Sequence, residues 1–320
     1  MINKKVVVMG GGHGQSALLR GIKQIDNIDI TTIVTVADDG GSTGRLRQYF
    51  AVPAMGDIRG VMLSLAEDEG LLASLMNYRF VAENDEDIEK DVMGHNLGNL
   101  ILLALMKSSG DFVQSIKTIS KVLNVKGEII PSSSQLITLY ARMEDDTIVK
   151  GEANIPNIDN RISKVFYDEV VKASTQAIEA ILSADLIIYG VGSIYTSILP
   201  NVIIPEIKEA LNKSRGMKVY FCNAMSQPGE TSNYSMEDHV DALESHGAII
   251  ERVIVASDEI PDKLIRKYQD EGSTKVICKS KNYRIPLNYE PLLSFADDLI
   301  RHDALKVKRV VEKLLSEIEV

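Results

Sequence analysis

The sequence predicts an α/β fold with a mostly parallel, doubly wound sheet. Short apolar runs bounded by glycine are typical of buried parallel strands. They alternate along the chain with segments of helical periodicity, which is the order expected of parallel strands joined by crossover helices. Glycine-rich and polar loops follow several of the runs directly. In such sheets ligands bind at the carboxyl ends of the strands, so these loops are the first place to look for a site.

The first strand and helix are predicted by residues 4–24. Four apolar residues at 6–9 precede a glycine-rich turn, and Leu18, Ile22 and Ile25 then share one helical face. The spacing Gly12-x-Gly14-x-x-Ala17 fits a fingerprint for phosphate binding at a helix N-terminus. Residues Gly11, Gly12, His13, Gly14 and Gln15 are therefore candidate ligand contacts. The alternative is an ordinary strand-to-helix turn.

The remaining elements follow in order. Strands are predicted at residues 33–36, 185–189, 217–222, 248–255 and 275–278, with a hairpin formed by 137–141 and 147–149. Helices are predicted at 177–182, 205–213, 236–246 and 303–320, the last capped by Asp303. Residues 60–127 are mostly helical in pattern and are expected to form an insertion in a single domain, 1–320. The acidic stretch 83–91 is expected to be a solvated loop, with a lid over the site as the alternative.

Composition limits the function. The chain has 320 residues, 45% of them apolar, and a net charge of −10. This charge argues against a general role in nucleic-acid binding, because such proteins need a basic face. The apolar runs are too short for a signal peptide or a membrane span, which predicts a cytoplasmic protein without membrane insertion. The two cysteines, Cys222 and Cys278, are expected to be unpaired and to bind no metal.

The loop after the second strand, residues 37–47, is the most specific signal. Asp38 and Asp39 stand where an acid commonly binds ribose hydroxyls. Glycines and hydroxyls beside them offer donors for an anion, and an arginine adds a guanidinium for phosphate. The candidates are Asp38, Asp39, Gly41, Ser42, Gly44 and Arg45. Arg47 lies two residues after Arg45, so only one of the two arginines should face the pocket. The alternatives are Mg²⁺ held by Asp38, or by both acids, against a diphosphate, and a long surface turn.

Four later loops contribute further candidates. Asp57 is a ligand contact or a helix cap, and Asn96 and Asn99 cap a helix or bind ligand, while His95 is expected to be structural. Gly190, Gly192 and Ser193 repeat the strand–glycine–hydroxyl order of the first turn and predict a second phosphate nest. Asn223 follows another strand, where its amide can read a base or sugar or satisfy the backbone. No metal-ligand spacing or nucleophile–base set is recognisable.

Taken together, these motifs resemble the gluconeogenesis factor family (YvcK type) of the CofD-like superfamily. The motifs are Gly10-Gly11-Gly12-x-Gly14, residues 37–47, Gly56-Asp57-x-Arg59, Gly94-His95-x-x-Gly98-Asn99, Gly192-Ser193-x-Tyr195-Thr196-Ser197 and Gln227-Pro228-Gly229-Glu230-Thr231, in this order. The resemblance extends to Arg301-His302-Asp303. One position departs from it, because the family usually has threonine where this chain has His13, so one hydroxyl donor is lost.

The resemblance implies a Rossmann-like three-layer α/β/α fold and a cytoplasmic protein that binds UDP-sugars, notably UDP-N-acetylglucosamine, and also NAD-type dinucleotides. It places Tyr268 and Arg301 near the nucleotide-sugar, where a ring can stack on uracil and an arginine can pair with diphosphate. It also implies a role in cell shape and peptidoglycan supply during gluconeogenic growth. We expect a homo-oligomer with protein partners in cell-wall synthesis.

Three functions compete. The first is a regulatory protein that binds a UDP-sugar, requires no cofactor and has no catalytic residue, because no base or nucleophile stands out. The second is a CofD-like transferase of phosphorus-containing groups, which would use a nucleotide-diphosphate donor and Mg²⁺. The third is an NAD-dependent dehydrogenase, ranked last because the loop 37–47 is not the usual second turn of a dinucleotide-binding fold.

Overall fold

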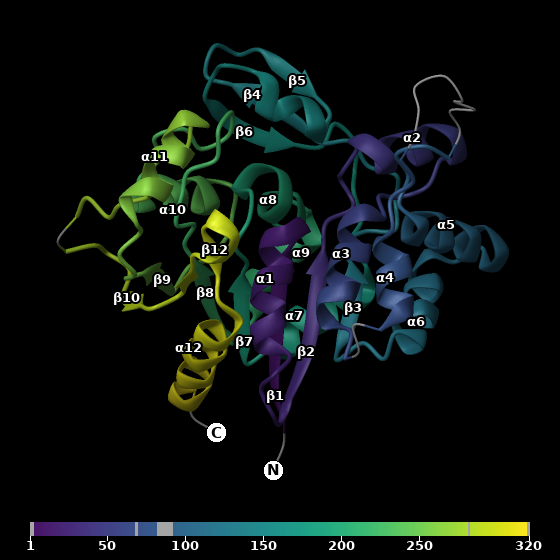
Figure 1. Cartoon of the computed structure of the whole chain (residues 1–320), viewed down its shortest axis with the longest axis horizontal. Helices are drawn as coiled ribbons and strands as arrows, with labels where there is room; N and C mark the ends of the chain where they lie inside the picture. The colour runs from purple at the N-terminus through teal and green to yellow at the C-terminus, as the bar shows by residue number, and fades with distance from the viewer. Residues whose placement is uncertain (1–2, 68–69, 82–91, 281, 319–320) are drawn as a thin grey trace.

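The computed structural model describes residues 3–67, 70–81, 92–280 and 282–318. Its centre is a seven-stranded sheet with the order β10-β9-β8-β7-β1-β2-β3, in which every neighbouring pair is parallel (Figure 1). This confirms the predicted α/β class. The strands are β1 (Lys4–Gly10), β2 (Ile28–Val34), β3 (Glu128–Pro131), β7 (Leu186–Tyr189), β8 (Met217–Phe221), β9 (Arg252–Ala256) and β10 (Leu287–Glu290).

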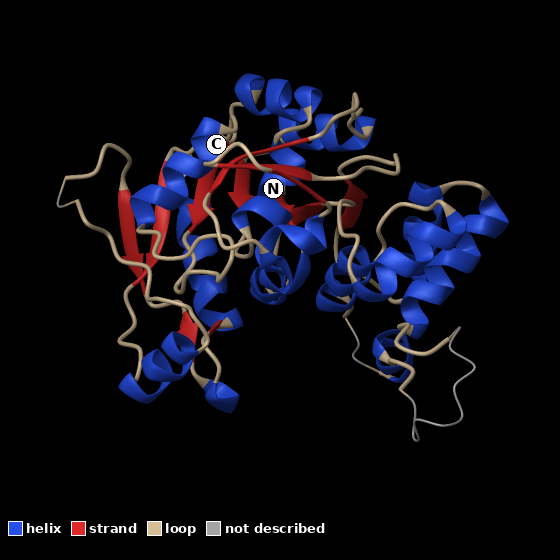
Figure 2. Ribbon diagram, turned by 90° about the horizontal axis from the view of Figure 1, so that it is seen from above, coloured by secondary structure: helices blue, strands red, loops and turns tan. Residues whose placement is uncertain are grey.

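Helices cover both faces of this sheet, which explains the continuous apolar runs in β1 and β7 (Figure 2). Val6, Val8 and Met9 of β1 are fully buried. On one face α1 packs against α3 and α12, and elsewhere α7 packs against α9. The helices that begin outside the 60–127 region are α1 (Gly12–Ile22), α2 (Gly41–Phe50), α3 (Gly56–Leu65), α7 (Thr175–Ser183), α8 (Leu199–Val202), α9 (Pro205–Lys213), α10 (Met236–Ser245), α11 (Asp262–Asp270) and α12 (Ala304–Glu317).

The strand order reverses between β1 and β7. The chain runs from β1 towards β2 on one side and from β7 towards β8 on the other. Because parallel crossovers are right-handed, the helices that follow β1 and β7 lie on opposite faces and leave a crevice between their N-terminal ends. Both predicted phosphate loops, residues 11–14 and 190–193, begin at this crevice.

A small antiparallel sheet lies beyond the main sheet, at the top of Figure 1. It has the order β5-β4-β6, formed by β4 (Tyr140–Met143), β5 (Ile148–Lys150) and β6 (Ile162–Phe166), so the predicted hairpin is confirmed. A 3₁₀ segment, η1 (Glu152–Asn157), connects β5 to β6. Near the C-terminus β11 (Leu293–Ser294) pairs with β12 (Arg301–His302), and η3 (Ala296–Asp298) lies between them.

The helical pattern at 60–127 is also confirmed. It contains the end of α3 and then α4 (Leu71–Asn77), α5 (Leu97–Ser109) and α6 (Phe112–Val122), which lie beside β3 on the right of Figure 1. A β-bridge between Ala66 and Val125 brings the two ends of this excursion together. The treatment of this region as an insertion in one domain stays a prediction. The acidic stretch 83–91 lies outside the described residues.

Two predicted strand boundaries are wrong, and one predicted strand does not form. β2 begins at Ile28, five residues before the predicted strand, and β9 begins only at Arg252, because residues 248–250 approach the sheet as buried loop. Residues 275–278 form no strand: Lys275 makes a single bridge to Met225. The edge strand is instead β10, whose half-buried Leu-Asn-Tyr-Glu sequence lacks an apolar run.

Other expectations hold. The carboxylate of Asp303 accepts hydrogen bonds from the N–H groups of Leu305 and Lys306 and so caps α12. Cys222 and Cys278 are unpaired, and Cys222 is buried. Among the described residues, no helix combines the length and apolarity needed to cross a bilayer.

Candidate functional site

Two glycine loops touch at the reversal of the strand order. A Cβ atom on Gly14 would lie 2.1 Å from the carbonyl oxygen of Val191, so only glycine allows this contact. Asn201, on α8, donates from Nδ2 to the carbonyl oxygen of Gly10 at 3.0 Å and ties the first loop to the helix after the second. The predicted pair of phosphate nests therefore forms one continuous backbone surface.

A cavity of about 460 Å³, called the first cavity, opens above these loops. Its lining comes from the two glycine loops, from η1, from the loop after β8, from α11 and from the β11–β12 hairpin. The lining residues include Gly11, Gly12, His13, Gly14, Glu152, Pro156, Gly192, Ser193, Thr196, Asn223, Gln227, Glu230, Tyr268, Ile300 and His302. Among the described lining residues there is no lysine and no arginine, so backbone N–H groups and neutral side chains supply the donors.

The floor of the first cavity is η2 (Ile194–Ile198), a short π-helix, a form that occurs frequently at functional sites. Ser193 caps it by accepting from the Thr196 N–H at 2.9 Å, and its hydroxyl donates to the Glu230 carboxylate. Burial raises the pKa of Glu230 to about 7, against the opposing effect of the Ser193 and Thr196 hydroxyls. Asn223 donates to the Gly192 carbonyl oxygen at 2.8 Å, which is the backbone role weighed for it above.

A second cavity of about 220 Å³ lies on the other side of the first loop. It shares Gly12 and His13 with the first cavity, so the two chambers meet at this turn. It is lined by the loop after β2 and by residues of α3 and α5: Gly12, His13, Ser16, Asp38, Gly40, Gly41, Ser42, Thr43, Gly56, Asp57, Arg59, Gly60, Arg79, Asn96 and Asn99.

Three acids near the junction of the two cavities repel one another. Burial, followed by the charge of Asp38, raises the pKa of Asp57 to about 7. Burial, followed by the charges of Asp38 and Asp57, raises the pKa of Glu152 to about 8. Burial also raises the pKa of Asp38, although the Gly40 N–H donates to it at 2.9 Å. Asp57 and Glu152 can therefore carry protons at neutral pH.

The acids do not form a complete metal site. No group of three His, Cys, Asp or Glu side chains within the described ranges could hold a metal ion. Mg²⁺ commonly needs only one or two carboxylates when phosphates complete its shell, and Asp38 and Asp57 both line the second cavity. The residues thus fit Mg²⁺ only together with a phosphate ligand.

Most predicted site residues gather around these two cavities. Gly11, Gly12, His13, Gly14, Gly192, Ser193, Asn223 and Tyr268 line the first, and Asp38, Gly41, Ser42, Asp57, Asn96 and Asn99 line the second. Tyr268 lies on α11, and its hydroxyl accepts from the Ile300 N–H at 3.1 Å. The ligand contacts of these residues stay predictions.

Six predicted residues line neither cavity: Gln15, Asp39, Gly44, Arg45, Gly190 and Arg301. Gln15 points into the sheet, where its Nε2 donates to the carbonyl oxygens of Val8 and Ile33. Asp39 accepts from the Ala153 N–H at 2.9 Å and so holds the start of η1. Arg45 donates to the Met93 carbonyl oxygen, and Arg301 is exposed on β12.

Arg47, like Arg45, lines neither cavity, and His95 is structural as expected. Arg47 is buried and donates to the carbonyl oxygens of Ala37 and Asp38. His95 is buried, and its Nδ1 lies 2.9 Å from the Ser42 hydroxyl. Asp57 and Asn96 are not side-chain caps: α3 has no side-chain cap, and Asn96 donates instead to the Asn77 carbonyl oxygen.

Sequence reasoning missed several lining residues, including Glu152, Arg79, Pro156 and His302. Glu152 and Pro156 belong to η1, and only the packing of the small sheet brings them to the floor loop. His302 is buried, which lowers its pKa to about 4, so it is neutral. The one available signal was its place beside Arg301, in the last motif of the family resemblance.

The comparisons with known proteins agree with one another. The family model described as 2-phospho-L-lactate transferase CofD matches residues 6–290. A curated protein of Bacillus subtilis named gluconeogenesis factor is 44% identical over 98% of both chains. One of Thermotoga maritima named putative gluconeogenesis factor is 41% identical over 97% of this chain and 99% of its own. A crystal structure of a UPF0052 family member from Bacillus halodurans superposes with a TM-score of 0.91 at 42% identity, covering 98% of this chain and all of that one.

Proposed function

Because the chain belongs to the CofD family, with relatives named gluconeogenesis factors, we propose that it binds a UDP-sugar, UDP-N-acetylglucosamine, in the first cavity. The observation that carries the proposal is the contact of two glycine loops at the strand-order reversal. Their N–H groups form a nest of the kind that binds phosphate oxygens, reinforced by the N-terminus of α1. The diphosphate lies over this nest.

The rest of the cavity supports a nucleotide-sugar. Tyr268 offers a ring on which uracil stacks, and the backbone and side chains of the loop after β8 offer hydrogen bonds to the sugar or base. Arg301 is exposed beside His302, which lines the cavity, and in this proposal its guanidinium would pair with the diphosphate. The cavity volume of about 460 Å³ falls in the range of pockets for small ligands.

The protein acts as a regulator in this proposal. It works in the cytoplasm, as a homo-oligomer with partners in cell-wall synthesis, and adjusts peptidoglycan supply and cell shape during gluconeogenic growth. The names of the relatives support the metabolic part of this role. Deleting the gene and measuring cell width on a gluconeogenic and a glycolytic carbon source tests it: equal shape on both media contradicts it.

Calorimetric titration with UDP-N-acetylglucosamine tests the binding step. We expect saturable binding that Tyr268→Ala weakens roughly tenfold, the size expected for losing one stacked base. Tyr289→Ala, on the edge strand β10 and half exposed, is the matched control and should bind like the wild-type protein. Absence of heat at millimolar ligand contradicts the proposal, and a parallel titration with NAD tests the dinucleotide alternative.

A second candidate is a transferase of phosphorus-containing groups, and the junction of the two cavities favours it. A donor diphosphate in the first cavity would point its reacting end past His13 towards an acceptor in the second. Asp38 and Asp57 would hold Mg²⁺ with the phosphates, and the metal would stabilise charge developing on the leaving group. Incubation with a nucleotide-diphosphate donor tests this: Mg²⁺-dependent release of nucleotide, lost in Asp38→Asn, supports it, and no release contradicts it.

A further inference from the structure

The wall and the floor of the first cavity come from separate parts of the fold. Glu152 and Pro156 of the wall belong to η1, in the small antiparallel sheet. Ser193 and Thr196 of the floor belong to the loop after β7, in the main sheet. The contacts that hold the small sheet against η2 therefore determine the shape of the first cavity.

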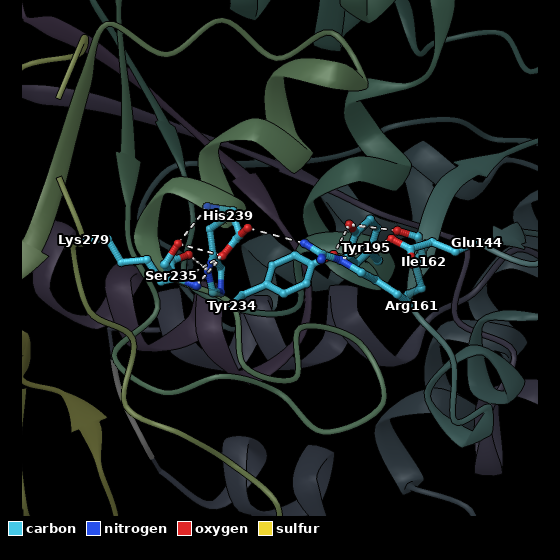
Figure 3. A network of polar contacts seen from close by, with 9 residues as sticks. Glu144, Arg161, Ile162, Tyr195, Tyr234, Ser235, His239 and Lys279 are labelled. Carbon is cyan, nitrogen blue, oxygen red and sulfur yellow. Dashed lines mark hydrogen bonds and ion pairs between the residues drawn. The ribbon is translucent and has the colours of Figure 1, made fainter.

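Three side chains join these parts in a hydrogen-bond chain, shown in Figure 3 and called here the tyrosine tether: Arg161, Tyr234 and Tyr195. Its Arg161 end is half-exposed, and the contacts of the Tyr195 hydroxyl are buried. The Arg161 Nε lies 3.4 Å from the Tyr234 hydroxyl, which lies 2.9 Å from the Tyr195 hydroxyl. The Tyr195 hydroxyl lies 3.3 Å from the carbonyl oxygen of Ile162. Since a guanidinium only donates and a carbonyl only accepts, the chain has one direction, from Arg161 through both hydroxyls to Ile162.

The tether begins and ends on two consecutive residues at the start of β6. Arg161 immediately precedes β6 and Ile162 is its first residue, so the chain leaves β6, reaches η2 through Tyr195 and returns. The Arg161 guanidinium also lies over the Tyr234 ring, 4.7 Å from its centre, and pairs with Glu144 at 3.6 Å and Asp238 at 3.4 Å. It thus holds the β4–β5 turn, β6 and α10 together.

Local irregularities at both ends bring the partners into reach. Tyr195 lies in the π-helix η2. Ile162 lies at a register shift between β4 and β6, where two residues of β6 lie opposite one residue of β4. Bulges of this kind re-aim side chains and are frequent beside active sites. On the other side of η1, a Cβ on Gly229 would lie 1.8 Å from the Pro156 carbonyl oxygen, so η1 has little space to shift.

We propose that Arg161, Tyr234 and Tyr195 are positioning residues that set η1 over the floor of the first cavity and thereby set the affinity for its ligand. They do not touch the ligand: among the three, none lines either cavity. The affinity part of this inference rests on the function proposed above, whereas the placement of η1 does not.

The test uses phenylalanine substitutions, which remove a hydroxyl and keep the ring. Tyr195→Phe and Tyr234→Phe should each weaken UDP-N-acetylglucosamine binding about fivefold to tenfold, the size of one buried hydrogen bond. The double variant should lose little more than either single variant, because both act on the same chain. Tyr140→Phe is the matched control: it lies in β4 of the same small sheet, stacked on Phe166, with no hydroxyl hydrogen bond in the described contacts.

Hydrogen exchange of residues 151–158 supplies a readout that needs no ligand. Exchange there should be faster than wild type in Tyr195→Phe and Tyr234→Phe and unchanged in Tyr140→Phe. Arg161→Gln should show the same increase, and Arg161→Lys should restore part of the protection, since it keeps the charge but not the planar group.

Two outcomes would overturn the proposed role of the tyrosine tether. One is equal exchange in all variants; the other is a lower thermal midpoint with wild-type exchange and affinity, which would mean a merely structural role. If the wild-type protein shows no heat with UDP-N-acetylglucosamine, the proposed function fails, and the exchange comparison still decides the placement of η1.

Discussion

The two cavities share a wall but handle charge in opposite ways. The first has backbone N–H groups, hydroxyls and two glutamates, and no cationic side chain among its described lining residues. The second has two arginines, Arg59 and Arg79, opposite two aspartates. Arg59 is oriented by the side chains of Asn99 and Asn77, with 3.0 and 2.9 Å between the bonded atoms.

The difference shows two ways to receive an anion in an acidic protein. Fixed backbone dipoles attract phosphate without adding a mobile charge, and their geometry depends on close backbone contacts. Arginines act over longer distances and respond to salt. A change that displaces the backbone should therefore weaken anion binding most in the first cavity. Changes of pH or of a charged side chain should affect anion binding differently in the two cavities.

The largest effect is expected from Gly14→Ala. The added methyl group would overlap the Val191 carbonyl group and push the two loops apart. Ligand affinity should fall by at least roughly 100-fold, since the backbone must move to relieve the overlap. Gly60→Ala, in the second cavity, is the control: its Cβ would meet only the Ser16 hydroxyl, at 3.8 Å, and helical alanine is favoured over glycine. Near-wild-type calorimetry of Gly14→Ala would contradict the contact.

Asp57→Asn should stabilise the ligand-free protein by on the order of 2 kcal/mol above pH 7. The folded-state pKa of Asp57 is raised to about 7 from 3.8, so the folded state binds the proton more tightly. The contribution of Asp57 to the free energy of unfolding therefore falls as pH rises from about 4 to about 7, and above pH 7 it no longer changes. Urea unfolding at pH 4.5 and pH 7.5 measures the difference, which should be small at the lower pH; a gain of equal size at both contradicts the raised pKa.

The affinity of the first cavity for a diphosphate should fall about tenfold between pH 6 and pH 9 without divalent cations. Glu152, with its pKa raised to about 8, gains a negative charge beside the ligand over this range. Glu152→Gln should flatten the profile above pH 7, leaving the smaller step from Glu230, whose pKa is about 7. Titrations at four pH values measure this; a wild-type profile in the variant would place the phosphates away from η1.

The smallest effect is expected from Arg79→Ala. If the diphosphate stays over the glycine loops, removing this cation from the second cavity changes UDP-N-acetylglucosamine affinity by less than about twofold. Arg79 donates to the Gly94 carbonyl oxygen at 2.7 Å, so its guanidinium is already engaged away from the glycine loops. A tenfold loss with a steep dependence on salt would show that the phosphates reach the second cavity, which is the arrangement a transferase requires.

Much of the fold and part of the site follow from local sequence. The strands β1, β7 and β8 were predicted because burial on both faces leaves an apolar run, and the loops after them were found for the same reason. The edge strand β10 was missed because its four residues are at most half-buried and contain no apolar run.

The errors at the site have a different origin. Gln15 was taken for a ligand contact, but two residues after His13 the helix has turned through more than half a revolution, and the side chain enters the sheet. Glu152 was missed because its approach to Thr196 depends on how the small sheet docks, which no local pattern records. Each glycine loop could be identified from its own sequence, but predicting that the two loops touch requires knowing that β1 and β7 are neighbours in the sheet.

The packing of α12 on α1 has a practical consequence. A Cβ on Gly21 would lie 2.4 Å from the carbonyl oxygen of Ala304, so the last helix presses on the backbone of the helix that begins at the ligand loop. Val307 and Val311 are fully buried in this contact region. Fragments that stop before Asp303 would leave an apolar stripe of α1 open to water, and we expect them to aggregate. Fragments made for screening should therefore retain this helix.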